Sequence, residues 1–162
     1  MGKKWMPATL VALLALVLQL VLLPLLSRDL NAANSFLALL VVMAPRRKKE
    51  WGLVWGALLG GLSDALLMQR IGFHGVSFTL LGYILGWTGG KMVISGLAAV
   101  YLLSLGAVLL DAALVTALFS LLEHPLALGA LLPPVAASAV ITPLLAIGLE
   151  WAYRRLASHS HD

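Results

Sequence analysis

The sequence predicts an all-α integral membrane protein, a bundle of six transmembrane helices that forms a single domain over residues 1–162. Of its residues, 61% are hydrophobic and 11% are charged, and the mean hydropathy is +0.99. Soluble domains carry about 25% charged residues, and a chain of this size could not enclose so much apolar surface in one core. The charged residues are also gathered into short clusters between long apolar runs.

A helix needs ~20 mostly apolar residues to cross the hydrocarbon layer of a membrane, and the chain contains six apolar runs that are candidates for such spans. The second and fourth runs are short, so the sequence leaves open whether each is tilted, re-entrant or broken. Pro45 closes the second, residues 88–91 predict a turn after the fourth, and Pro143 should kink the last or loosen one of its backbone bonds. The expected spans are 6–26, 30–44, 51–68, 73–87, 92–122 and 131–151.

The basic residues predict the orientation of these spans. With both ends of the chain in the cytoplasm, nine Lys and Arg residues lie in cytoplasmic segments and two in outer turns. This is a strong positive-inside bias, and an odd number of spans would weaken it. The cytoplasmic set is Lys3, Lys4, Arg46, Arg47, Lys48, Lys49, Lys91, Arg154 and Arg155, and the outer set is Arg28 and Arg70.

Several function classes are not expected for this sequence. The chain has no cysteine, which excludes disulfides, thiolate metal sites and cysteine nucleophiles. No basic stripe with interleaved aromatic residues indicates a nucleic-acid partner, and no motif of a hydrolase, a metalloprotease or a nucleotide-binding loop is present. We therefore expect no catalytic residues, no metal site and no cofactor, and any function must lie within the spans or in what they bind.

Two rows of glycines stand out in the third and fourth expected spans. Glycines at four-residue spacing share one helix face, and such rows let two helices approach closely in lipid. We interpret the rows as the seam of a tight hairpin, with the alternative that one row faces a partner protein. The first row is Gly52, Gly56 and Gly60, continued by Asp64, and the second is Gly82, Gly86 and Gly90, extended outward by Phe78 and His74.

Two acidic residues within the spans are candidate functional groups, because charge is costly in a membrane. Asp64 is expected near the outer end of its helix, where it either serves a site or fixes the turn through backbone groups, Arg70 or His74. Asp111 is expected at a different depth, near the middle of the fifth span. An unpaired charge there costs about 2.5–3.5 kcal/mol, so Asp111 should face protein or stay protonated. Its role is either a structural hydrogen bond, with Gln19, Asn34, Ser104 and Thr142 as plausible neutral partners, or a contact to a partner or ligand.

Glu150 precedes Arg154 by four residues. This spacing is favourable for an ion pair on a helix surface. We expect this pair near the membrane interface, with no further role.

Three segments carry a resemblance to a known family. They are Gly-Ala-Leu-Leu-Gly-Gly-Leu-Ser-Asp at 56–64, Arg-Ile-Gly-Phe-His-Gly at 70–75 and Leu-Leu-Gly-Tyr at 80–83. This pattern resembles the MreD family of rod shape-determining membrane proteins, and the basic loop 46–49 fits it as well. The match covers about thirty residues, and the rest agrees in hydropathy and length.

The resemblance implies a scaffold of the bacterial cell-elongation machinery in the inner (cytoplasmic) membrane, which supports rod shape and lateral peptidoglycan synthesis. Such proteins work by assembly rather than catalysis, with MreC, the actin-like MreB and the RodA glycosyltransferase with its transpeptidase. The candidate partner-binding or structural residues are then Asp64, His74, Asp111, Tyr83 and the two glycine rows.

The MreD family is also distantly similar to the substrate-binding subunits of energy-coupling-factor vitamin transporters. That similarity implies a compact six-helix bundle. It also gives the alternative function, a small-molecule (vitamin-like) binding subunit of a membrane transporter, whose pocket would be lined by Asp64, His74 and Asp111.

Overall fold

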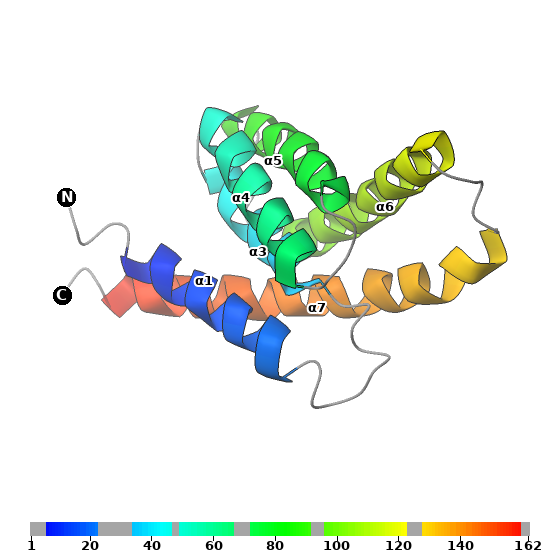
Figure 1. Ribbon diagram of the computed structural model, residues 1–162. Helices are drawn as coiled ribbons and strands as arrows, with labels where there is room; N and C mark the ends of the chain where they lie inside the picture. Colours follow the sequence, from blue (N-terminus) through cyan, green and yellow to red (C-terminus); the bar gives the residue numbers. More distant parts are fainter. Residues whose placement is uncertain are drawn as a thin grey trace.

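The computed structural model describes residues 6–22, 34–46, 49–66, 72–91, 96–122 and 128–159, and the regular structure in these ranges is entirely helical (Figure 1). The all-α prediction is therefore confirmed. The elements are α1 (Met6–Val17), continued by the π-helical turn η1 (Leu18–Leu22), α3 (Ser35–Met43), the 3-10 turn η3 (Ala44–Arg46), α4 (Lys49–Leu66), α5 (Phe73–Lys91), α6 (Leu97–Leu122) and α7 (Leu128–His159).

Two of these helices are long and apolar enough to cross a membrane. They are the segments Leu97–Leu121 of α6 and Pro133–Ser158 of α7. Two further helices are apolar but shorter, Thr9–Leu20 and Ser35–Arg46. By length and composition alone, these two helices are candidate membrane spans.

The short helix α3 lies at the centre of the fold and contacts α1, α4, α6 and α7. Each of its nine residues is buried, as expected for a helix that is apolar on every side. Its length is about 14 Å at ~1.5 Å per residue, about half of a ~30 Å hydrocarbon core. The helix begins at Asn34, whose side chain accepts hydrogen bonds from the N–H groups of Phe36 and Leu37, and it ends before Pro45 as expected.

Helices α4 and α5 form the tight hairpin that the glycine rows predicted (Figure 1). A Cβ atom on Gly56 would lie 2.9 Å from the Cα of Thr79, and one on Gly60 would lie 2.8 Å from the Cα of Gly75. A Cβ atom on Gly52 would lie 3.1 Å from the carbonyl carbon of Gly82. The two backbones are therefore in direct contact along the whole seam, which only glycine permits.

The end of the hairpin at which α4 begins and α5 ends, which we call its inner end, differs from the prediction. Residues 88–91 are not a turn but the last turn of α5. The physical reason is a close contact between Gly89 and η3, because a Cβ atom on Gly89 would lie 2.5 Å from the Cα of Pro45. Gly89, rather than Gly90, thus makes the innermost glycine contact, and a Cβ atom on Gly90 would meet open space.

The last two helices also have different bounds from those predicted. Helix α6 begins at Leu97, directly after Gly96, whose φ of +114° lies outside the helical region. Helix α7 contains 32 residues and extends past both ends of the range 131–151. Pro143 lies inside it as expected. The predicted residues 23–26, 30–33, 67–68 and 92–95 lie outside the described part of the chain.

Candidate functional site

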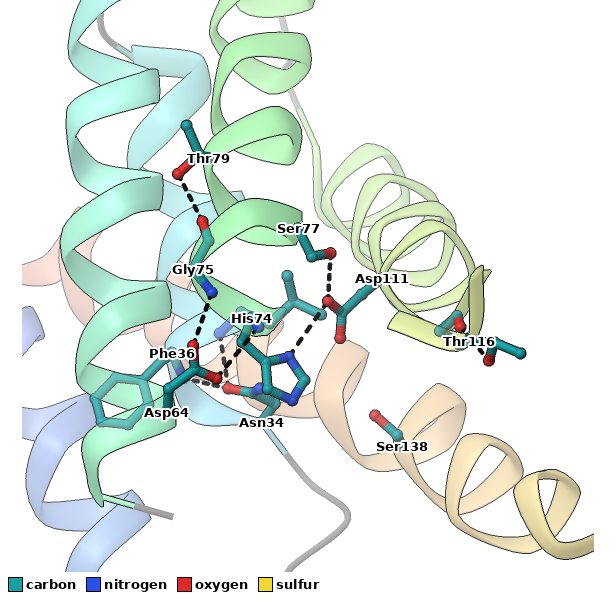
Figure 2. Close-up of polar contacts among 12 residues, drawn as sticks. Asn34, Phe36, Asp64, His74, Gly75, Ser77, Thr79, Asp111, Thr116 and Ser138 are labelled. Carbon is teal, nitrogen blue, oxygen red and sulfur yellow. Dashed lines mark hydrogen bonds and ion pairs between the residues drawn. The ribbon is translucent and has the colours of Figure 1, made fainter. Parts of the chain in front are cut away.

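The carboxylate of Asp64, on α4, binds the beginning of α5 (Figure 2). It accepts three backbone N–H groups, from Gly72 at 2.8 Å, His74 at 3.2 Å and Gly75 at 3.0 Å. The first N–H groups of a helix have no partner within the helix and carry partial positive charge, so a buried carboxylate is well placed there. Asp64 is only 1% exposed.

These contacts match the interpretation in which Asp64 fixes the turn through backbone groups. Gly72 adopts a φ of +105°, a conformation that glycine allows at little cost, and this brings its N–H toward the carboxylate. Arg70, the other expected partner of Asp64, lies outside the described residues.

Asp111 of α6 also meets the first turn of α5. Its Oδ1 atom accepts a hydrogen bond from Ser77 Oγ at 2.6 Å and lies 3.5 Å from His74 Nδ1, as Figure 2 shows. Phe73 and Phe119 make an edge-to-face contact between the same two helices, with ring centroids 4.6 Å apart. The outer cluster, which we define as Asp64, His74, Ser77 and Asp111, therefore joins α4, α5 and α6.

Two predictions about Asp111 were wrong. It does not use the neutral partners proposed for it, and along α5 it lies level with Asp64 rather than apart from it, because both carboxylates contact His74. The pairing depends on how α6 crosses α5, which brings together residues 34 positions apart in the chain. Local sequence patterns carry no signal for that crossing.

The side chains proposed as partners of Asp111 make other contacts. Gln19 Oε1 accepts the N–H of Ser35 at 2.7 Å, and Thr142 Oγ1 accepts the N–H of Asn34 at 3.3 Å. These bonds supply partners for the N–H groups at the buried start of α3, which would otherwise be costly to leave unpaired. Ser104 donates to the carbonyl oxygen of Tyr101 on its own helix.

The outer cluster contains the residue types of a serine hydrolase triad in a different arrangement. In a triad the imidazole stands between the hydroxyl and the carboxylate, so that it can accept the hydroxyl proton. Here the carboxylate of Asp111 stands between Ser77 and His74. The arrangement ties α5 to α6, and among the described residues no group of three or more His, Cys, Asp or Glu side chains could hold a metal ion.

A second buried carboxylate lies at the opposite end of the fold. Glu150 of α7 is 0% exposed and binds two arginines. Arg46 Nη2 lies 2.5 Å from Glu150 Oε1, and Arg154 Nε lies 2.6 Å from the same oxygen. The Arg46 guanidinium also lies 4.7 Å from the ring centroid of Tyr153 and donates to the carbonyl oxygen of Val42. We call Glu150, Arg46, Arg154 and Tyr153 the inner cluster.

The i,i+4 pair of Glu150 and Arg154 is confirmed, but the expectation that Glu150 has no further role was wrong. The sequence analysis assigned Arg46 only a role in topology, whereas the fold brings it to a carboxylate 104 positions away. Nothing in the local sequence around Arg46 indicates that pairing.

The remaining predicted residues lie apart from both clusters. Lys49 begins α4 and is exposed, whereas Arg47 and Lys48 lie outside the described residues. Gly86 faces Gly52 across the hairpin seam. Tyr83 is 40% exposed and lines an apolar groove on the outward face of the hairpin.

The outer cluster, the glycine seam and the inner cluster together form the candidate site. No protein-family model, no curated protein and no solved structure matches this chain.

Proposed function

We propose that this chain is a multi-pass protein of the bacterial cytoplasmic membrane and a non-enzymatic scaffold of the cell-elongation machinery that binds MreC. The observation that carries the proposal is the coincidence of the MreD-like segments with one structural unit. Segment 56–64 provides the glycine seam and Asp64, and segment 70–75 provides the N–H groups that Asp64 binds. The residues that resemble the family are thus those that fix the α4–α5 hairpin.

Placement in a membrane is supported by the apolar outer surface of α6 and α7. In the most apolar stretch of each helix, only 17% of the residues of α6 and 28% of those of α7 are buried within the fold. Large apolar side chains point outward instead, with Leu102 at 66%, Leu121 at 80% and Leu144 at 58% exposure. Extended exposed apolar patches are rare on soluble monomers, whereas a bilayer covers them without cost.

The inner cluster supports an even number of spans with both ends on one side. The charge distribution predicts Arg46 and Arg154 on the cytoplasmic side, and both bind Glu150. Two arginines on one carboxylate must lie at the same depth. The proposal therefore includes the short helix α3 among the six membrane-embedded elements. In this arrangement α3 belongs to a broken or re-entrant segment rather than to a straight crossing.

A capture experiment tests the scaffold proposal. The tagged chain is co-expressed with MreC, extracted gently into nanodiscs and purified through its tag. We expect MreC to co-elute, and an absence of association in both detergent and nanodiscs would refute the proposal. Recovery of an ATP-hydrolysing subunit together with a bound vitamin-sized molecule would instead favour the transporter alternative.

A matched pair of variants tests whether MreC capture depends on the α4–α5 hairpin. Asp64→Asn and Glu50→Gln each remove one carboxylate from α4, but Asp64 is buried and Glu50 is exposed. We expect Asp64→Asn to reduce MreC capture several-fold and Glu50→Gln to leave it unchanged. Equal capture of MreC by both variants would show that Asp64 only fixes the turn and does not contribute to MreC binding.

A further inference from the structure

An apolar groove of about 590 Å³ runs along the outward face of the α4–α5 hairpin. Small side chains form its middle, with Ala57 on α4 and Thr79 on α5, and larger ones form its rims. Val76 is 57% exposed and Leu80 is 44% exposed. Among the residues that the structure describes, none covers these two side chains.

A second cavity, of about 330 Å³, lies at the inner end of the same hairpin. Its walls carry charge, with Lys49 and Glu50 from the start of α4 and Lys91 from the end of α5. Trp87 forms an aromatic wall, and the Lys91 ammonium lies 3.9 Å from the centroid of that ring. Gly90 leaves the floor open, because a Cβ atom there would meet no other atom within 4 Å.

The groove and the cavity lie on the same face of the hairpin. On α5, Val76, Leu80, Tyr83 and Trp87 follow one another at intervals of three or four residues, which places them in one stripe. The stripe continues to Gly90 in the cavity. An elongated molecule can therefore occupy both spaces at once.

The chemistry of the two spaces is complementary to different parts of one ligand. The positive N-terminal end of α4 and the negative C-terminal end of α5 meet at this cavity and offset each other. The two lysines outweigh the single carboxylate of Glu50, so the cavity carries a net positive charge and attracts an anion. The groove offers mainly apolar contacts to the rest of the ligand. Trp87 lies between the two, where an interfacial tryptophan is expected.

We propose that this face binds one anionic phospholipid of the cytoplasmic leaflet, with its phosphate between Lys49 and Lys91 and an acyl chain in the groove. The stripe from Trp87 in the cavity to Val76 in the groove spans eleven residue steps, about 16 Å along the helix. That length is close to half of a ~30 Å hydrocarbon core, the depth that one acyl chain fills. The inference rests on the membrane placement proposed above and not on MreC.

Native mass spectrometry of the purified full chain tests the proposal, with phosphatidylglycerol and phosphatidylcholine added in equal amounts. We expect at least tenfold more phosphatidylglycerol to be retained. The double variant Lys49→Gln/Lys91→Gln should lose about tenfold of this binding. The matched control is Arg155→Gln, which removes an arginine that stacks on Trp151 outside the cavity. It should bind like the wild-type chain, and equal retention of the two lipids, or no loss in the double variant, would overturn the proposal.

Two variants that keep the charge separate a lipid from a free anion. Ala57→Phe fills the groove and Gly90→Leu fills the cavity, and both positions face open space, so folding is checked by circular dichroism and expected to be intact. We expect each to reduce phosphatidylglycerol binding at least fivefold. Unchanged binding in Ala57→Phe, or full displacement of the lipid by millimolar inorganic phosphate, would show a simple anion site and overturn the lipid assignment.

A negative result in the lipid experiment and a negative result in the capture experiment refute different proposals. The lipid measurement contains no MreC, so loss of MreC capture with intact phosphatidylglycerol binding would refute the scaffold function alone. If Ala57→Phe abolished MreC capture while all variants bound lipid equally, the groove would belong to a partner helix. That result would overturn the lipid site.

Discussion

Asp64 and Glu150 are both buried carboxylates, at 1% and 0% exposure, but their partners differ in kind. Asp64 binds three backbone N–H groups of the first turn of α5. Glu150 binds the side chains of Arg46 and Arg154, which are 30% and 52% exposed. One carboxylate is thus held by fixed donors and the other by donors that can turn toward water.

This difference determines what the loss of each carboxylate costs. Backbone N–H groups at a helix start cannot move away, so they remain unpaired when their acceptor is removed. Partly exposed arginines regain hydration. The outer end of the hairpin should therefore be far less tolerant of substitution than the inner cluster.

The largest effect is expected for Asp64→Ala. The variant leaves the N–H groups of Gly72, His74 and Gly75 without their acceptor, at a cost of about 3 kcal/mol or more in the free energy of unfolding. Unfolding in mixed micelles measures the loss, and hydrogen exchange at those amides localises it. Glu50→Ala, at an exposed position on the same helix, should change stability by less than about 0.5 kcal/mol. Similar losses in the two variants would contradict the comparison.

The next effect is expected at the glycine seam. Gly56→Ala would place a Cβ atom 2.7 Å from the carbonyl carbon of Phe78, so the helices must separate at a cost of about 1–3 kcal/mol. Gly61→Ala is the matched control, because its Cβ atom would meet nothing within 4 Å. There the better helix propensity of alanine should stabilise the chain by up to about 1 kcal/mol. The same unfolding assay should therefore give opposite signs, and equal signs would argue against a close seam.

A smaller loss is expected for Glu150→Ala. Removing one partner of a fully buried pair costs about 3–5 kcal/mol, but the exposure of Arg46 and Arg154 reduces this to about 1–2 kcal/mol. Glu150→Gln keeps an acceptor for both arginines and should lose less. A loss larger than that of Asp64→Ala would show that the arginines cannot reach water and would reverse the ranking.

The smallest effect is expected for Asp111→Asn. The amide oxygen of asparagine can still accept the hydrogen bond from Ser77, so the loss should stay below about 1 kcal/mol. Ser77→Ala removes the donor instead and leaves the carboxylate with His74, with an expected loss of about 1 kcal/mol. Thermal unfolding of Asp111→Ala, Ser77→Ala and their double mutant gives the coupling energy of the pair, because each of these changes removes the hydrogen bond. A coupling near zero would remove Asp111 from the outer cluster.

The sequence by itself determined the all-α class and the glycine seam. Both are properties of single segments, since apolar length and a four-residue repeat can be read within one helix. The same holds for the position of Asp64 at the end of the first glycine row, directly before the turn whose N–H groups it binds.

Only the tertiary structure decided the partners of Asp111, the pairing of Glu150 with Arg46 and the enclosure of α3. These contacts join residues 34 and 104 positions apart, and they depend on the angles at which helices cross. Helix periodicity states which face of a helix is apolar, but not which neighbour that face meets. Asp64, His74 and Asp111 could therefore be proposed from the sequence as separate candidates, whereas their meeting at one turn of α5 required the packed fold.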